Sequence, residues 1–259
     1  MIILKNPDQL AKMRSAGHLL HDVLAQVRAF IQPGMTTLDV NAYTDELIRK
    51  GGGIPTELGY EGYPASICAS IDDEVVHGIP SAEVKLEEGM ILSVDVTLAL
   101  DGWQADSAFT VPIGSVSEEK QRLIRVTEEC FWQGAGAAVA GNRIGDIGCA
   151  VQRHAEKNGM NSVRDLTGHG IGRKMHEDPA VPNFGEPGHG PRLRPGMTVC
   201  IEPMITLGRW PVHQLSDGWT IVTNDHRPSA HYEHTVAITA QGRPEILTLP
   251  GAQWKGAQD

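Results

Sequence analysis

The chain has 259 residues and a formal net charge of −10, from 32 acidic and 22 basic side chains, and 41% of its residues are hydrophobic. Its length suits one α/β domain, since such domains often contain roughly 200–250 residues, and its negative charge argues against nonspecific binding to nucleic acid. The sequence contains neither an apolar run of the ~18–20 residues that cross a membrane nor a signal-peptide pattern, so we expect a cytoplasmic protein.

The first predicted helix begins close to the N-terminus. Asn6 followed by Pro7 is typical of an N-cap and a first helical residue, and apolar residues then recur at helical spacing from Leu10 to Val27. We expect this helix to end before Pro33, because proline cannot continue it.

A second helix is predicted from near Thr37 to the glycines that begin at Gly51, which suit a helix C-cap. Its apolar stripe is expected to contain Leu38, Leu47 and Ile48. Segments with the character of strands follow.

The same order recurs in the second half of the chain. One helix is predicted from Ser117 through Cys130, and another from Ile144 to Asn158, which stops at Gly159. Strand-like segments again follow this pair of helices.

Two short passages indicate that the chain is a duplicated helix–helix–strand unit. The passage Glu88–Asp95 resembles Pro195–Glu202, and the positions of their final carboxylates differ by 202 − 95 = 107. The positions of the glycines that end the second helix of each half, Gly51 and Gly159, differ by 159 − 51 = 108. This agreement predicts one domain over residues 1–259, with pseudo-repeats at about 1–110 and 111–248 and a loose tail at 249–259.

Polar and apolar side chains alternate around Asp95, Glu202 and Glu233, and each carboxylate belongs to the polar set. Because alternate residues of a strand share one face, the pattern predicts a sheet with one apolar and one polar face. We therefore expect an α+β fold in which an antiparallel-rich sheet is covered by four helices on its apolar face and carries carboxylates on the other.

Carboxylates on a half-buried face need a compensating positive charge, because a buried unpaired anion costs several kcal/mol. Asp95, Asp106, Glu202 and Glu233 could bind divalent metal, and His169, in a glycine-rich segment, could add one nitrogen. Taken alone, Asp106 could instead cap a turn and His169 could be a core histidine. Their joint occurrence in matching parts of a duplicated unit favours a metal site.

The cysteines indicate neither a disulfide framework nor a zinc ribbon, because they lie far apart and form no CxxC pair. They are expected to be buried or pocket-lining thiols: Cys68, Cys130, Cys149 and Cys200.

Several of these residues belong to short motifs that occur in a specific order. They are His77-Gly78-Ile79-Pro80, Val94-Asp95-Val96, Asp106, Gly168-His169-Gly170-Ile171-Gly172, His176-Glu177, Ile201-Glu202-Pro203-Met204 and Tyr232-Glu233-His234-Thr235. Each motif is weak, but the ordered set resembles, nearly end to end, the type I methionine aminopeptidases of bacterial type, in peptidase family M24. The resemblance implies the pita-bread fold, whose curved sheet carries helices on its outer face.

The resemblance also implies a dinuclear metal-dependent aminopeptidase that removes the initiator Met from nascent proteins, preferably before a small second residue. Its two divalent ions, Co, Mn, Fe(II) or Zn, would be held by Asp95, Asp106, His169, Glu202 and Glu233, with Asp106 and Glu233 bridging both. A metal-bridged hydroxide would attack the first peptide bond, since metal binding lowers the pKa of water to about 7 in favourable cases. Glu202 would then transfer the proton.

By the same resemblance, His77 and His176 contact the scissile amide and stabilise the tetrahedral intermediate. The pocket for the Met side chain is expected to be lined by Tyr60, Tyr63, Cys68, Met175 and Trp219. The resemblance further implies a monomer that acts near the ribosome.

Two residues depart from the family pattern. Met175 stands where relatives carry Phe, although Met fills a similar space. Glu57 lies near a pocket position that is usually uncharged, and no pocket role is assigned to it.

Three alternative functions share parts of this pattern. A proline-directed peptidase of the same fold would share the ligands but usually has a long N-terminal domain, whereas His77 here leaves room before it only for the first helices and strands of the catalytic unit. A type II enzyme would have a helical insert between the last two glutamates, yet Glu202 and Glu233 are 31 positions apart. A binding protein without activity usually loses ligands, and here all five are present.

Overall fold

The computed structural model describes residues 1–251. Helix α1 spans Pro7–Phe30 and begins with a capping box, in which the Asn6 side chain accepts a hydrogen bond from the Gln9 N–H and the Gln9 side chain accepts one from the Asn6 N–H. The predicted first helix is therefore confirmed, and it ends before Pro33 as expected.

Helix α2 spans Thr37–Lys50, close to the predicted bounds, and ends at Gly51. Its buried face is formed by Thr37, Val40, Thr44 and Ile48. The prediction that Leu38 belongs to this face is wrong, because Leu38 is 43% exposed. The buried positions after Thr37 recur every four residues, and Leu38 lies two residues before Val40, on another side of the helix.

Helices α3 and α4 span Glu118–Ala137 and Ile144–Lys157. Ser117 caps α3 as predicted, but the helix continues past Cys130. The residues beyond Cys130 are held by tertiary contacts, since Phe131, Trp132 and Ala135 are buried in the core. At Gly134 a Cβ atom would lie 2.9 Å from a methyl carbon of Val151 on α4. The bare glycine lets the last turns of α3 pack closely against its neighbour.

The central sheet has nine strands, and its pairings are antiparallel. Its main path follows the order β1 (Ile54–Pro55), β4 (Ile91–Leu100), β5 (Trp103–Pro112), β14 (Glu233–Ala237), β9 (Thr198–Ile201), β7 (Thr167–Gly170) and β8 (Glu177–Pro182). Two further strands lie off this path: β2 (Cys68–Ile71) beside β4, and β15 (Glu245–Ile246) beside β14.

Two three-stranded sheets and a short 3-10 helix, Tyr60–Gly62, complete the described elements. The first sheet has the order β13 (Ser229–His231), β10 (Met204–Thr206) and β6 (Asn161–Ser162). The second has the order β11 (Val212–Gln214), β12 (Ile221–Thr223) and β3 (Glu74–Val76).

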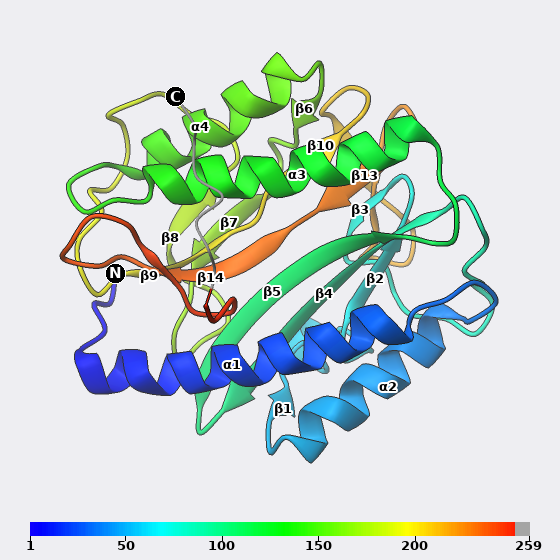
Figure 1. The fold of residues 1–259 in the computed structure, drawn as a ribbon, viewed down its shortest axis with the longest axis horizontal. Coiled ribbons are helices and arrows are strands. Elements are labelled where there is room, and N and C mark those ends of the chain that lie inside the picture. The colour runs from blue at the N-terminus through cyan, green and yellow to red at the C-terminus, as the bar shows by residue number, and fades with distance from the viewer. Residues whose placement is uncertain (252–259) are drawn as a thin grey trace.

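Two helix pairs lie on the same side of the central sheet, α1 with α2 and α3 with α4 (Figure 1). The apolar side chains of β4, from Leu92 to Leu98, pack against buried residues of α1 and α2. Val199 and Ile201 of β9 pack instead with Phe131 of α3 and residues of α4. The predicted fold, a mostly antiparallel sheet with four covering helices, is confirmed.

Within residues 1–251, every helix is too short or too polar to cross a lipid bilayer. The division into two pseudo-repeats within one domain stays a prediction. At the start of the predicted tail, Leu249 packs against the core cluster that contains Phe131, while residues 252–259 lie outside the described part of the chain.

Candidate metal centre

The strand register brings the predicted acidic ligands to one face of the central sheet. Thr97 of β4 pairs with Asp106 of β5, so Asp95, two residues from Thr97, lies on the same face as Asp106. Glu233 of β14 pairs with Ala108, two residues beyond Asp106, and therefore shares that face as well. Neighbouring strands thus supply a patch of carboxylates.

Glu202 follows β9 directly, and its neighbour Ile201 pairs with His234 of β14. The next position along this antiparallel ladder brings Glu202 beside Glu233. His169 comes from β7, which is hydrogen-bonded to β9. The sheet therefore joins residues that are far apart in the sequence.

The irregular backbone of β7 sets the position of His169. The register between β7 and β8 shifts between Gly168 and Gly170, on either side of this histidine. A Cβ atom on Gly168 would lie 2.4 Å from the Cys200 carbonyl oxygen, and one on Gly170 would lie 2.2 Å from the Asp178 carbonyl oxygen. Both glycines are needed because neighbouring backbone passes too close for a side chain.

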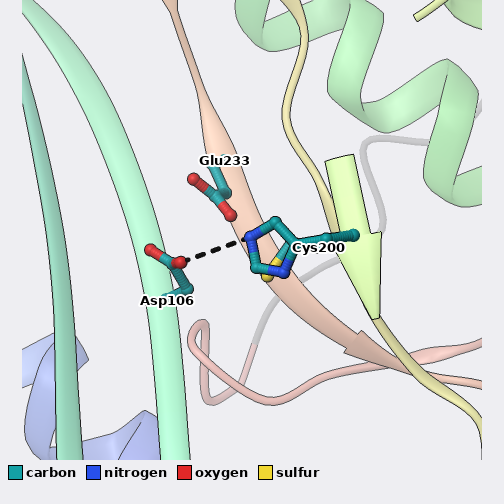
Figure 2. Close-up of side chains that lie close together, drawn as sticks. Asp106, Cys200 and Glu233 are labelled. Atoms are coloured by element: carbon teal, nitrogen blue, oxygen red, sulfur yellow. Dashed lines mark ion pairs between the residues drawn. The ribbon is translucent and has the colours of Figure 1, made fainter. Parts of the chain in front are cut away.

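The side chains of Asp106, Cys200 and Glu233 lie close together (Figure 2). One donor atom from each of Asp106, His169, Cys200 and Glu233 lies within 4.8 Å of the others. The His169 Nε2 atom is 3.6 Å from an oxygen of Asp106 and 3.6 Å from an oxygen of Glu202. Two further groups of the same kind are present among the described residues. Asp95 lies with Glu57 and Cys68, and Glu202 lies with His231 and Glu233.

The electrostatics of the cluster favour a cation. Burial, followed by the neighbouring charge of Asp106, holds the pKa values of Asp95 and Glu233 well above their ordinary values. Burial also raises the pKa of Glu202 to about 8, with Asp106 adding to the shift while His169 opposes it. Placing several carboxylates together in a buried site is costly unless a positive charge compensates them.

Several buried carboxylate oxygens of this cluster have no hydrogen-bond partner within residues 1–251, and this bears on whether a metal fits the site. Asp95 Oδ1, Asp106 Oδ1 and Glu233 Oε1 are buried and have no hydrogen-bond partner among the described residues. Buried polar atoms nearly always have a partner, and an absent ion is one explanation for those that do not. Carboxylate oxygens with one imidazole are a donor set that suits Mn, Fe(II), Co or Zn, so a divalent metal fits the site.

Cys200 also lies within the cluster, although it is not among the predicted ligands. Its thiol is buried beside apolar residues such as Met13 and Ile171, and burial raises the pKa of Cys200 well above its ordinary value. The four cysteines are free and buried, as expected.

His77 and His176 lie beside the carboxylate cluster, on the wall of the same cavity. Burial lowers the pKa of both, and that of His176 to about 4, so both imidazoles are neutral at pH 7. The Tyr60 hydroxyl lies 2.6 Å from the His176 Nδ1 atom. If the phenol donates to Nδ1, the Nε2 atom of His176 carries the proton and can donate to a substrate.

The cavity has a volume of about 380 Å³, and the five predicted pocket residues all lie on its wall. The rings of Tyr63 and Trp219 meet edge to face with centroids 5.0 Å apart, and Tyr63 and Cys68 form a small buried apolar cluster that Trp219 packs against. Met175 is 6% exposed. One side of the cavity is therefore apolar, and the other carries the carboxylates.

Two residues at the site, Glu57 and His231, were not predicted from the sequence. Glu57 lines the cavity and accepts hydrogen bonds from Thr97 Oγ1 at 3.1 Å and from Cys68 Sγ at 3.5 Å. It lies in the irregular segment after β1, so no periodic pattern indicated the direction of its side chain. His231 lies two residues before Glu233, and that alternate spacing was a signal that could have found it.

Comparisons with known proteins identify the family. The profile of metallopeptidase family M24 matches residues 11–240. A methionine aminopeptidase of Clostridium perfringens is 48% identical over 249 residues, covering 96% of this chain and 99% of the relative. Methionine aminopeptidase 1 of Bacillus subtilis is 42% identical, with 96% and 99% covered.

Solved structures give the same result. The crystal structure of methionine aminopeptidase from Rickettsia prowazekii superposes with a TM-score of 0.94 at 40% identity, covering 96% of this chain and 100% of that one. The prolidase of Pyrococcus furiosus has a TM-score of 0.75 at 18% identity, and the match covers 66% of its length. The likeness to prolidase concerns the fold alone.

Proposed function

The chain belongs to metallopeptidase family M24, and from this premise and its similarity to bacterial methionine aminopeptidases we propose that it removes the N-terminal Met from peptides and newly made proteins. The observation that carries the proposal is a buried group of carboxylates and one imidazole that opens onto a cavity with an apolar wall. The carboxylates and the imidazole suit hydrolysis with divalent metal, and the apolar wall suits a Met side chain.

Asp95, Asp106, His169, Glu202 and Glu233 would hold two divalent ions, with Asp106 and Glu233 shared between them. The unpaired buried oxygens of Asp95, Asp106 and Glu233 support this assignment. When bound, the ions would supply positive charge that makes a water molecule acidic enough to react at neutral pH. Co, Mn, Fe(II) and Zn all suit these donors.

The protein's own residues would then handle the proton and the substrate. Glu202 takes the proton from the attacking water and delivers it to the departing amine, while the water oxygen bonds to the carbonyl carbon and the carbon–nitrogen bond breaks. His176, held by Tyr60, donates a hydrogen bond to the oxyanion, and His77 contacts the scissile amide. Neutral imidazoles suit these tasks because each offers one N–H donor.

Substrate selection would come from the apolar wall, where Tyr63, Cys68, Met175 and Trp219 contact the Met side chain. The terminal amine would lie toward the carboxylates. We extend the proposal to removal during translation, near the ribosome in the cytoplasm, by a monomer that prefers a small second residue. These last features rest on family resemblance.

A peptide assay tests the function directly. Metal-free protein is reloaded with Mn(II), Co(II), Fe(II) or Zn(II) and given Met-Ala-Ser or Ala-Pro peptides. We expect release of Met from the first peptide and no cleavage of the second. Cleavage of the proline peptide alone would make the protein a proline-directed peptidase, and cleavage of neither with any metal would favour a binding protein.

Matched variants connect the activity to the site. Glu202→Gln removes the proposed proton acceptor and should abolish release of Met. Glu186→Gln makes the same chemical change at a side chain that is 81% exposed, and it should leave the rate unchanged. Equal rates for the two variants would exclude the role assigned to Glu202.

A further inference from the structure

His231 is a buried residue that the proposed function does not use. It lies at the end of β13 and is 1% exposed. Its Nε2 atom is buried and has no hydrogen-bond partner among the described residues. Since buried polar side-chain atoms are nearly always paired, this nitrogen requires an explanation.

The backbone holds His231 firmly in place. Its N–H donates to Thr110 Oγ1 at 3.0 Å, and the Thr110 hydroxyl donates in return to the His231 carbonyl oxygen at 2.8 Å. On the other side, His231 pairs with Met204 of β10. The backbone position of His231 is therefore fixed by two neighbouring strands.

The Nε2 atom faces the proposed metal centre. It is 3.7 Å from Oε2 of Glu233, and one donor atom from each of Glu202, His231 and Glu233 lies within 4.8 Å of the others. Glu233 is one of the two carboxylates proposed to bridge the metal ions. The separation between Nε2 and Oε2 is longer than a hydrogen bond, but such bonds in ligand-free sites are often long and tighten when the site is filled.

We propose that His231 is a positioning residue whose Nε2–H donates a hydrogen bond to the Glu233 carboxylate and orients it for metal binding. The inference rests on the proposed function, because it gives Glu233 the role of a shared ligand. Carboxylates that bind metals are commonly held by an outer hydrogen bond, and loss of such a partner typically costs about 10–100-fold in metal affinity.

Metal titration of the metal-free protein tests the proposal without depending on activity. Calorimetry with Mn(II) should show that His231→Leu weakens one of two binding steps by about 10–100-fold. His231→Gln, whose amide can still donate, should restore most of that affinity. His189→Leu, at a side chain that is 71% exposed, should bind as the unchanged protein does.

A spectroscopic readout separates the positioning role from direct ligation and does not require a variant. In protein labelled with nitrogen-15 at histidine and loaded with diamagnetic Zn(II), His231 Nε2 should carry a proton. A metal-bound Nε2 would overturn the proposal, and so would full affinity for both ions in His231→Leu. Release of Met by the unchanged protein is measured separately, so failure here is distinguishable from failure of the proposed function.

Discussion

Tyr60 and His176 show how one hydroxyl can set the chemistry of a neighbouring residue. The phenol lies 2.6 Å from Nδ1, and the two rings meet nearly edge to face with centroids 5.1 Å apart. Tyr60 was expected on the pocket wall, where it lies, but its contact with His176 was not predicted from the sequence. The contact holds the orientation of the imidazole, and when the phenol donates, the proton of the neutral ring lies on Nε2.

Tyr60→Phe is therefore expected to slow turnover more than it weakens binding of a Met peptide. Loss of a hydrogen bond worth about 1 kcal/mol predicts a kcat roughly fivefold lower. Steady-state kinetics on Met-Ala-Ser measure the effect. Tyr43→Phe, at a ring that stacks on Phe30, is the control, and equal kcat values for the two variants would contradict the role of Tyr60.

Asp106 gives a second prediction at the level of one residue. Asp106→Asn keeps the shape of the side chain but removes a charge that both ions are proposed to share, so we expect loss of turnover and of at least one metal equivalent. Native mass spectrometry counts the bound ions. Asp101→Asn, in the exposed turn between β4 and β5, is the matched control. Two full equivalents in Asp106→Asn would exclude the shared role.

The size of the side chains that strand β7 can carry is limited by the strands on either side of it. Gly168 and Gly170 lie where backbone from β8 and β9 leaves no room for a Cβ atom, and His169 is held between them. The tight spacing of these strands thus positions the single imidazole of the proposed ligand set. A side chain larger than that of glycine at either position would push β7 away from its neighbouring strands.

Gly170→Ala is expected to lower the free energy of unfolding by about 1–3 kcal/mol and to weaken metal binding, since it overpacks β7 against the Asp178 backbone. Chemical denaturation and metal titration measure the two effects. Gly136→Ala has open space on an exposed helical surface and should raise the free energy of unfolding by about 0.5–1 kcal/mol. Equal effects of both variants would exclude crowding as the cause.

At the scale of the whole molecule, the buried carboxylates connect stability to pH. Burial, with a further contribution from Asp106, raises the pKa of Glu57 to about 8, and burial raises that of Glu202 to about 8 as well. Burial by itself would lower the pKa of His169. Its interactions with Asp106 and Glu202 outweigh burial and raise the pKa of His169 to about 9. Each of these groups holds its proton more tightly in the folded protein than in the unfolded chain.

The metal-free protein should therefore lose stability as the pH rises from about 7 to about 9, because the unfolded chain has already released these protons. The histidines whose pKa is lowered do not offset this loss, since above pH 6.5 they are mostly neutral in both states. Thermal unfolding across this range, with and without metal, measures the effect.

Bound divalent ions should both raise Tm and flatten its dependence on pH, because they favour the ionised carboxylates and bind only the folded protein. Removing metal with a chelator at pH 8 should lower Tm again. The same slope with and without metal would show that these carboxylates do not face the ions.

Local patterns in the sequence determined much of this protein. The Asn6 and Ser117 caps, the glycines after α2 and α4 and the alternation around Asp95 each act within a few residues, so they predicted helix ends and strand faces. The ordered motifs likewise identified the family. These signals depend on backbone geometry and on short sequence separations.

Only the tertiary structure decided which groups meet across the sheet. The exposure of Leu38, the extension of α3 beyond Cys130, the burial of Glu57 and the direction of His231 all depend on contacts with distant segments. Strand register and the packing of irregular segments are set by such long-range contacts, because the free energy of burial belongs to the assembled core and not to any short stretch of chain.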